Sequence, residues 1–367
     1  MPKKLKLILI NLSVLLIGIL IIELSFGGWL SNSNQLSNLG IIKDAKFEFE
    51  VGDLYMTKTP TITYTRDAYG LRGIATFNQP EKIDILTVGG STTDQRYLDD
   101  SQTWQETLQS EFQKNGKDIY VSNAGVDGQS TYGHLKSTEI WFPKIEKLQP
   151  KVMLYYVGIN DFYRVNSDAI YDDIQQVNSG GFKQKIKDNS VLYNVYRKIR
   201  GMQKATKFEV GHRNIDFSRV HYTKEEVLNE KLLEIYDETN LKAFKTRILK
   251  LIDYAKSNNA TPIFVTQPTM HYKIRNGVVY GTENINYLEE KYAYNGIGYL
   301  TLLNKLNQAM KEVAGEASVI DLTNDEDWNI MDFYDYFHNT PTGAKKVGQK
   351  IYEKLSKLEI INVELKH

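Results

Sequence analysis

The chain has 367 residues, of which 41% are hydrophobic and 25% are charged. This length suits one large α/β domain with extensions, and the composition is that of an ordinary globular protein, which excludes wholesale disorder. Basic and acidic side chains number 45 each, so no excess positive charge is available for phosphates and we expect no nucleic-acid partner. The absence of cysteine excludes disulfides, thiolate zinc sites and a cysteine nucleophile.

The N-terminal segment predicts a membrane anchor. Three lysines within the first six residues precede Leu7–Ile22, an almost entirely apolar run. Extended to Phe26, the segment makes a helix of roughly 30 Å, about the thickness of the hydrocarbon core of a bilayer. Because such lysines stay in the cytoplasm, we predict a cytoplasmic tail at residues 1–6, a transmembrane helix at 7–26 and an extracytoplasmic remainder. A cleaved signal peptide is the alternative, but the run is long and no clear cleavage site follows it.

Residues 27–80 are expected to form a stalk and an irregular or β-rich lead-in. Ser31–Asn34 is a polar linker, and Thr61–Tyr64 alternates like a short strand before the turn-prone Asp67–Gly70.

The main domain, residues 81–357, alternates apolar strand-like runs with helical patterns. The strand candidates are Ile83–Val88, Tyr120–Val121, Val152–Val157, Pro262–Thr266 and Val319–Leu322. The helix candidates are Trp104–Lys114, Leu241–Lys256 and Thr342–Leu355. This alternation predicts an α/β fold with a parallel sheet covered on both faces. A short C-terminal tail, residues 358–367, completes the chain.

The periodic pattern is lost at about residues 165–240. This stretch contains Gly180-Gly181, many charges and helix-like pieces at Val191–Ile199 and Glu225–Tyr236. It is too long for a plain connection, so we predict a helical insertion over one end of the sheet. The insertion is either a lid over a substrate or a packing appendage.

The loops after the strands are where ligand sites of open α/β sheets lie. The first carries Gly89-Gly90-Ser91, whose glycines let the backbone turn sharply and present the Ser91 hydroxyl. Two alternatives exist for this segment. It could cap a helix through Ser91 or Thr92, or it could bind phosphate, although no Walker-type lysine follows.

Two further loops carry candidate hydrogen-bond donors. The segment from Asn123 to Ser130 includes Gly128, whose N–H group can be free, and Gly158-Ile159-Asn160-Asp161 directly follows an apolar strand. An amide such as that of Asn160 can donate to a developing oxyanion. The alternative role for Asn160 is to cap the following helix.

A fourth segment near the C-terminus, Asp335-Tyr336-Phe337-His338, pairs a histidine with an upstream carboxylate. Histidine can accept a serine proton, and the carboxylate can hold the imidazole in the required tautomer. A second carboxylate, Asp332, lies six residues before His338. We expect it to be a solvated loop residue or a turn former.

Taken together, the four segments resemble in order and context the sequence blocks of SGNH (GDSL-like) hydrolases. The resemblance covers roughly residues 62–357 and includes the lead-in Thr65–Gly73, which is similar to that of membrane-linked members. It implies a three-layer, flavodoxin-like fold. It also implies that Ser91 is the nucleophile, His338 the base and Asp335 the residue that orients it. Gly128, Asn160 and the Ser91 backbone N–H would form the oxyanion hole.

Many family members have Gly-Asp-Ser in the first block, whereas Gly90 stands here in the acidic position. This departure removes no catalytic group but weakens the transfer of a lipase-like substrate preference.

The function that follows from the resemblance is that of a single-pass, membrane-anchored serine esterase with an extracytoplasmic catalytic domain. We expect an acyl-serine intermediate, no metal or organic cofactor, and an acylated small molecule or a cell-surface glycan, carrying O-acetyl groups, as substrate. Two alternatives remain open at this point. The same site could transfer the acyl group to a sugar hydroxyl, or the protein could be a non-catalytic glycan-binding or assembly protein.

Overall fold

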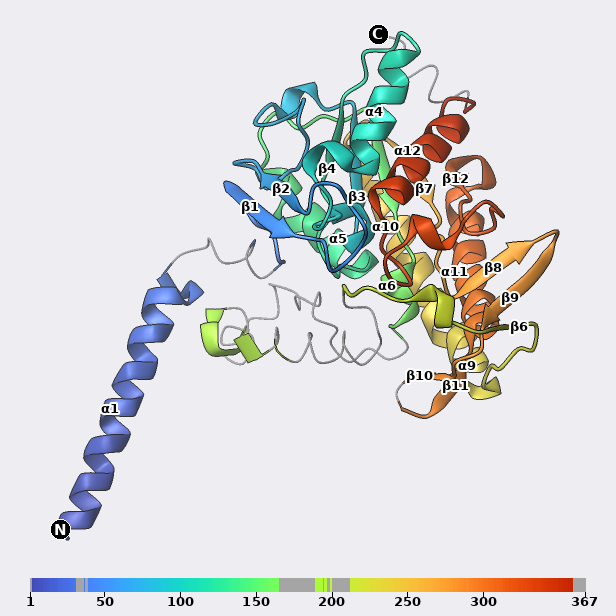
Figure 1. Cartoon of the computed structure of the whole chain (residues 1–367). Coiled ribbons are helices and arrows are strands. Elements are labelled where there is room, and N and C mark those ends of the chain that lie inside the picture. The colour runs from blue at the N-terminus through green and yellow to red at the C-terminus, as the bar shows by residue number, and fades with distance from the viewer. Residues whose placement is uncertain are drawn as a thin grey trace.

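A five-stranded parallel sheet forms the centre of the protein in a computed structural model (Figure 1). The structure describes residues 2–30, 36, 39–164, 189–193, 195, 196, 199, 212–288 and 290–358. The strands of the central sheet are β3 (Ile85–Gly89), β4 (Val121–Asn123), β5 (Val152–Tyr156), β7 (Thr261–Val265) and β12 (Val319–Ile320). Their order is β4-β3-β5-β7-β12, so the chain reverses its direction of growth between β3 and β5.

This order is that of a flavodoxin-like, doubly wound sheet, as expected from the sequence. All residues of β3, β4 and β5 are buried. Full burial explains the mostly apolar sequences of β3 and β5, because a parallel sheet is covered on both faces.

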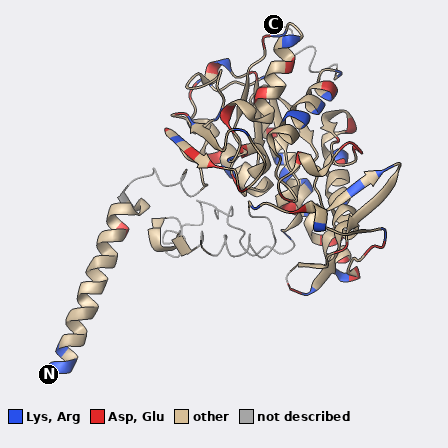
Figure 2. Cartoon of the chain, in the orientation of Figure 1, with Lys and Arg blue, Asp and Glu red and all other residues tan. Residues whose placement is uncertain are grey.

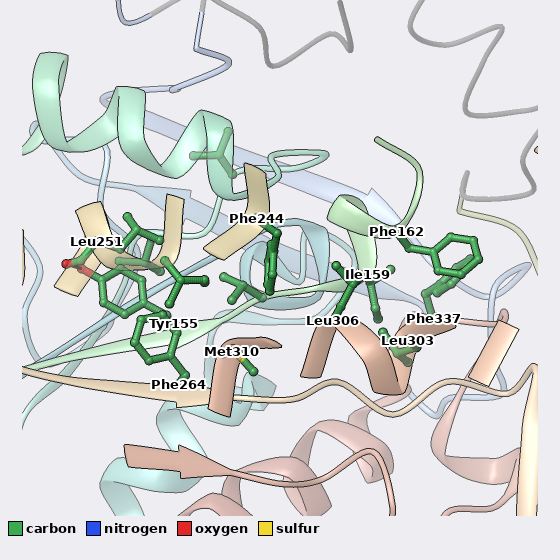
Figure 3. Close-up of a cluster of buried hydrophobic side chains, with 14 of the residues drawn as sticks. Tyr155, Ile159, Phe162, Phe244, Leu251, Phe264, Leu303, Leu306, Met310 and Phe337 are labelled. Carbon is green, nitrogen blue, oxygen red and sulfur yellow. Dashed lines mark hydrogen bonds between the residues drawn. The ribbon is translucent and has the colours of Figure 1, made fainter. Parts of the chain in front are cut away.

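One face of the sheet is covered by α4 (Trp104–Lys114) and α12 (Pro341–Leu355), which pack against each other. The other face is covered by α5 (Thr131–Ile140), α10 (Leu241–Ser257) and α11 (Gly296–Ala314). Figure 3 shows the core on this second face, with Tyr155 and Phe264 of the sheet facing Leu251 and Met310 of the helices. The sheet is the middle layer, and the helices on its two faces are the outer layers. A buried hydrophobic cluster lies between the sheet and each layer of helices.

The ends of these helices follow from local sequence. The Thr103 side chain accepts a hydrogen bond from the Glu106 N–H and caps α4, and Thr340 caps α12 in the same way. Proline at the first position of α12 removes an N–H that would have no partner in the helix. The bounds predicted for α4 are confirmed, and α12 begins one residue earlier than predicted.

Within the described residues, three smaller sheets lie outside the central one. Their strands are β1 (Ala45–Glu50), β2 (Thr61–Arg66), β6 (Tyr222–Thr223), β8 (Tyr272–Arg275), β9 (Val278–Thr282), β10 (Asn286–Leu288) and β11 (Tyr292–Tyr294). They pair as β1-β2, β6-β9-β8 and β10-β11, all antiparallel. Further helices whose bounds lie within the described residues are α1 (Lys3–Phe26), α3 (Ser91–Asp94), α6 (Ile159–Phe162), α9 (Glu230–Ile235) and a π-helix (Tyr236–Asn240).

The lead-in after β2 is tied to the domain by two buried arginines. The Arg66 guanidinium pairs with the buried Asp94 carboxylate and donates to the Gly70, Asn123 and Gly125 carbonyls. The Arg72 guanidinium donates to the backbone carbonyls of residues 94, 95 and 98, and its Nε lies 2.7 Å from Asp100. Both arginines belong to the lead-in segment Thr65–Gly73. Their hydrogen bonds hold the loops that follow β3 and β4 against the lead-in segment.

We expect Arg66→Met to destabilise the fold by about 3–5 kcal/mol, because it leaves the buried Asp94 carboxylate without its main partner. Urea unfolding of the full chain measures this change. Arg219→Met is the matched control. Arg219 forms an exposed pair with Asp216, so its loss should cost less than about 1 kcal/mol. Equal effects of the two substitutions would contradict the structural role of Arg66.

The N-terminal helix α1 stands apart from the central sheet (Figure 1). It has 24 residues, none of them buried, and by length and composition it can cross a membrane. Its charges are confined to its ends, with basic residues at the N-terminal end and an acidic residue near the other (Figure 2). This helix is consistent with a single-pass anchor and equally with a signal sequence.

Several predicted features lie wholly or partly outside the described residues. These are the linker Ser31–Asn34, most of the C-terminal tail and residues 165–188 and 200–211 of the insertion. Within the insertion, the described residues of Val191–Ile199 are helical, and residues 212–240 return to the domain. The Ile215 N–H donates to the Tyr334 carbonyl, and β6 pairs with β9. The end of the insertion is therefore built into the main domain beside the C-terminal motif.

Candidate active site

Ser91 follows β3 at the point where the sheet reverses its order. The turn Gly89-Gly90 leads into the single-turn helix α3, whose N-cap is Gly90 and carries no side-chain cap. Neither Ser91 nor Thr92 acts as a helix cap. The Thr92 hydroxyl instead accepts a hydrogen bond from the Gln267 amide at 2.6 Å. The structure thus excludes the capping role that the sequence left open for this segment.

His338 and Asp335 complete a hydrogen-bonded chain with Ser91. The His338 Nε2 lies 2.8 Å from the Ser91 Oγ, and its Nδ1 lies 2.6 Å from the Asp335 Oδ2. The other Asp335 oxygen accepts from the N–H groups of Phe337 and His338, so the turn itself fixes the carboxylate. Phe337 lies at one end of the core cluster (Figure 3) and packs the motif onto the domain. The three predicted residues therefore meet, although 247 positions separate Ser91 from His338.

The charges around His338 favour a protonated ring. Burial by itself lowers the pKa of His338, but the nearby carboxylates, Asp335 first and then Asp127 and Asp94, together outweigh this effect, and the pKa is raised above its ordinary value of 6.5. An imidazole with a raised pKa is a stronger base. With Asp335 accepting the Nδ1–H, the neutral ring presents its Nε2 lone pair to the Ser91 hydroxyl.

Asp332 does not take the place of Asp335. It is buried, which shows that the prediction of a solvated loop carboxylate is wrong. Its Oδ2 accepts from the Asn329 N–H in a capping box and pairs with Lys346 at 2.9 Å. The partner Lys346 lies on α12. Asp332 thus ties the loop before the motif to that helix.

Asn160 lies at the end of β5, next to the loop that carries Ser91. Its side chain does not cap α6, whose N-cap is Gly158. One N–H of its amide donates to the Gln129 carbonyl at 2.8 Å. A Cβ added at Gly90 would lie 2.5 Å from the Asn160 Nδ2. Glycine at position 90 therefore lets the Asn160 amide approach the Ser91 loop closely.

Gly128 is placed differently from the other predicted residues. It adopts a φ of 75°, the left-handed conformation that favours glycine. Its neighbour Gln129 lines the pocket around Ser91, whereas Gly128 is not among the lining residues. The structure thus brings Ser91, Asn160 and His338 to one pocket and leaves Gly128 at its margin.

The pocket above Ser91 collects residues from every loop at this edge of the sheet. Gln267, which follows β7, links two of these loops by donating to Thr92 and accepting from the Ile159 N–H. The described residues that line the pocket are Gly90, Ser91, Thr92, Gln129, His134, Tyr156, Val157, Gly158, Ile159, Asn160, Asp161, Gln267, Phe337 and His338. Most of these are polar residues or glycine.

His212 is a site residue that the sequence did not reveal. Its ring centroid lies 4.0 Å from that of His338, and its Nδ1 lies 2.6 Å from the Tyr334 hydroxyl. Burial, and then the nearby His338, lower the pKa of His212. Its Nε2 lies 3.8 Å from Asp127, which also pairs with Arg96. No local pattern around His212 signals this position, because its neighbours in space come from distant loops.

Among the described residues, His212, Asp335 and His338 are grouped closely enough to hold a metal ion, with ligand atoms within 4.8 Å of one another. However, both ring nitrogens of His338 already face hydrogen-bond partners, Asp335 and Ser91. A metal bound there would have to break this chain. The donor set therefore fits a proton relay better than a metal centre.

Comparison with known proteins agrees with this geometry. The chain matches the model of the GDSL-like lipase/acylhydrolase family over residues 87–346. No curated protein matches it. Similar solved structures include the acetyl xylan esterase AlAXEase, with 14% identity, a TM-score of 0.41 and coverage of 74% of this chain and 98% of that chain.

TesA is similar at 13% identity and a TM-score of 0.39, with coverage of 75% and 98%. A member of the lipolytic protein G-D-S-L family from Veillonella parvula DSM 2008 is similar at 12% identity and a TM-score of 0.39, with coverage of 75% and 100%. These structural likenesses are weak, whereas the family model spans well over half of the chain. The chain belongs to the GDSL-like lipase/acylhydrolase family.

Proposed function

We propose that this protein is a membrane-anchored serine esterase that removes short acyl groups, such as O-acetyl, from a cell-surface glycan. The hydrogen-bonded chain from Ser91 through His338 to Asp335 carries the proposal. In it Ser91 attacks the ester carbonyl, His338 takes the hydroxyl proton and returns it to the leaving alcohol, and Asp335 stabilises the imidazolium. Water then releases the acyl group from Ser91 with His338 as base.

The developing oxyanion is stabilised by N–H donors around Ser91. Asn160 uses one amide hydrogen on the Gln129 carbonyl, so the second remains available for the substrate. Ser91 is the first residue of α3, so its backbone N–H has no hydrogen-bond partner within that helix. Gly128 is the proposed third donor. Such donors act strongly because they are fixed before the charge develops.

The substrate class is inferred from the lining of the pocket. A long acyl chain requires an extended apolar channel, whereas the described lining is mostly polar or glycine, with Val157, Ile159 and Phe337 as the aliphatic or phenyl members. This lining supports a short acyl group on a polar alcohol. An anchored enzyme with its site outside the cell would meet such esters on envelope glycans.

Release of acetate by the full chain from O-acetylated glycans tests the substrate class. We expect release from at least one envelope glycan and little hydrolysis of long-chain esters such as palmitate. A preference for long-chain esters would contradict a short-acyl site. Transfer of the acetyl group to an added sugar, with no free acetate, would show that the same site is an acyltransferase.

We expect the activity to rise with pH as His338 loses its proton. Because the pKa of His338 is raised, the acidic limb of kcat/KM should have its midpoint above pH 6.5. Below that midpoint the ring is protonated and cannot accept the Ser91 proton. A pH profile with a small acetyl ester measures this limb. A midpoint below pH 6.5 would show that Asp335 does not raise the pKa of His338.

If α1 is the proposed anchor, we expect the domain to lie outside the cytoplasm and to stay attached to the membrane. Alkaline phosphatase fused after His367 should be active and should sediment with membranes, because basic residues stand at the N-terminal end of the apolar helix α1. Release of a shortened protein into the soluble fraction would show that residues 3–26 are a cleaved signal. An inactive fusion would show the opposite orientation.

A further inference from the structure

The end of the insertion places His212 against the proposed catalytic base. The centroids of the His212 and His338 rings lie 4.0 Å apart, with 31° between the ring planes. Tyr97 packs against His212 in an edge-to-face arrangement, with the centroids 4.7 Å apart. The backbone after His212 is fixed to the domain, because the Ile215 N–H donates to the Tyr334 carbonyl at 2.8 Å. His212 is thus held against the one ring that must keep its orientation during the reaction.

A second chain of polar groups orients the His212 ring. Its Nδ1 lies 2.6 Å from the Tyr334 hydroxyl, and its Nε2 lies 3.8 Å from the Asp127 Oδ1. The negative charge of Asp127 favours the ring hydrogen on Nε2, so Nδ1 accepts from the Tyr334 O–H. Burial keeps this phenol protonated, since it raises the pKa of Tyr334 well above its ordinary value of 10.0. The His212 Nε2–H therefore faces the Asp127 carboxylate, at a distance longer than a hydrogen bond.

Asp127 brings a negative charge to this side of the site. Arg96, from the loop that follows α3, lies 3.2 Å from the Asp127 Oδ2. Burial opposes ionisation, but His212 and Arg96 lower the pKa of Asp127, so its carboxylate stays charged. The same carboxylate contributes to the raised pKa of His338. Two carboxylates therefore act on the base, Asp335 directly at Nδ1 and Asp127 from beside His212.

These contacts matter most after Ser91 has attacked, when His338 carries the proton and a positive charge. A protonated His212 would repel that charge. Burial, and then the neighbouring His338, lower the pKa of His212 and so keep its ring neutral.

We propose that His212 is a positioning residue for His338. It holds the plane of that ring toward Ser91 and, together with Asp127, stabilises the imidazolium that forms during the attack. The end of the insertion is then part of the catalytic site. The inference rests on the proposed function, because it takes His338 as the base.

Kinetics of the full chain with a small acetyl ester test this role. His212→Ala leaves the bonds from His338 to Ser91 and Asp335 in place, so we expect kcat to fall about 10- to 100-fold, with KM within about twofold. His221→Ala, at an exposed histidine on the same segment, is the matched control and should leave kcat within about twofold. If the two substitutions change kcat equally little, the positioning role is wrong.

Asp127→Asn tests the charge while the His212 ring stays in place, and it keeps the proposal testable if His212→Ala does not fold. Because the Asp127 carboxylate raises the pKa of His338, its loss should move the acidic limb of kcat/KM to lower pH. An acidic limb that does not move would show that this side of the site only packs, which would overturn the proposal.

The double substitution shows whether Asp127 acts through His212. We expect Asp127→Asn to lower kcat several-fold in the unsubstituted protein and by less than about twofold in the His212→Ala background. Additive losses would contradict a joint action of the two residues. Ser91→Ala in the same assay separates the possible failures. If it is inactive while His212→Ala is fully active, the nucleophile stands and the positioning role is wrong. If Ser91→Ala keeps full turnover, the proposed function is wrong as well.

Discussion

Ser91→Ala is expected to lower kcat on a small acetyl ester by roughly 10⁴- to 10⁶-fold, because no other group can form the acyl-enzyme. The fold should be almost unaffected. Within the described part of the chain, the Ser91 hydroxyl is hydrogen-bonded to His338 alone, so its loss costs on the order of 1 kcal/mol or less. Steady-state kinetics and urea unfolding of the same preparation separate the two effects.

Ser101→Ala is the matched control for this substitution. The Ser101 hydroxyl bonds to Asp99 on the surface and takes no part in the pocket. Its loss should leave kcat within about twofold of the unsubstituted protein. Unchanged turnover in Ser91→Ala would show that another residue is the nucleophile.

The second large effect is expected for Asp335→Asn, which should lower kcat by up to about 10⁴-fold. An asparagine oxygen can still accept from the Phe337 and His338 N–H groups, so the turn should persist. Its amide would then donate to the His338 Nδ1, which forces the proton onto Nε2 and removes the acceptor for the Ser91 proton. Loss of the carboxylate also lowers the pKa of His338, so the acidic limb of the residual activity should move to lower pH.

Asp332→Asn provides the comparison for that substitution. It weakens the pair with Lys346 and the capping of the loop, so we expect a loss of stability and a change in kcat of only a few-fold. Circular dichroism checks that both variants fold. Equal and slight effects on kcat would show that His338 is oriented by another group, whereas a larger loss at Asp332 would show that the motif was aligned incorrectly.

Local sequence was sufficient to predict the central sheet, and the resemblance of four loop segments to one family predicted the chain of Ser91, His338 and Asp335. The strands β3 and β5 are fully buried, so their sequences are mostly apolar, and the strand ends then place the loop motifs at one edge. The capping threonines and Pro341 mark helix ends that agree within about a residue with the predicted ones. These features depend on neighbours a few positions away.

Other features depend on partners that are distant in sequence. The helix α5 was not predicted, because it buries His134, Lys136 and several small residues and so lacks a clear apolar face. The helix α11 was also missed, although the leucines at positions 302, 303 and 306 give it a recognisable amphipathic pattern. Burial of Asp332 depends on Lys346, and the place of His212 depends on the path of a long insertion.

The most direct test of the account is covalent labelling of Ser91. A fluorophosphonate reacts with a serine only where a base and an oxyanion site activate it. We expect intact-mass analysis of the full chain to show one adduct, peptide mapping to place it on Ser91, and inactivation to follow its formation. The Ser91→Ala variant should gain no adduct. An active protein that gains no adduct, or gains one at another residue, would contradict the assignment of Ser91 as the nucleophile.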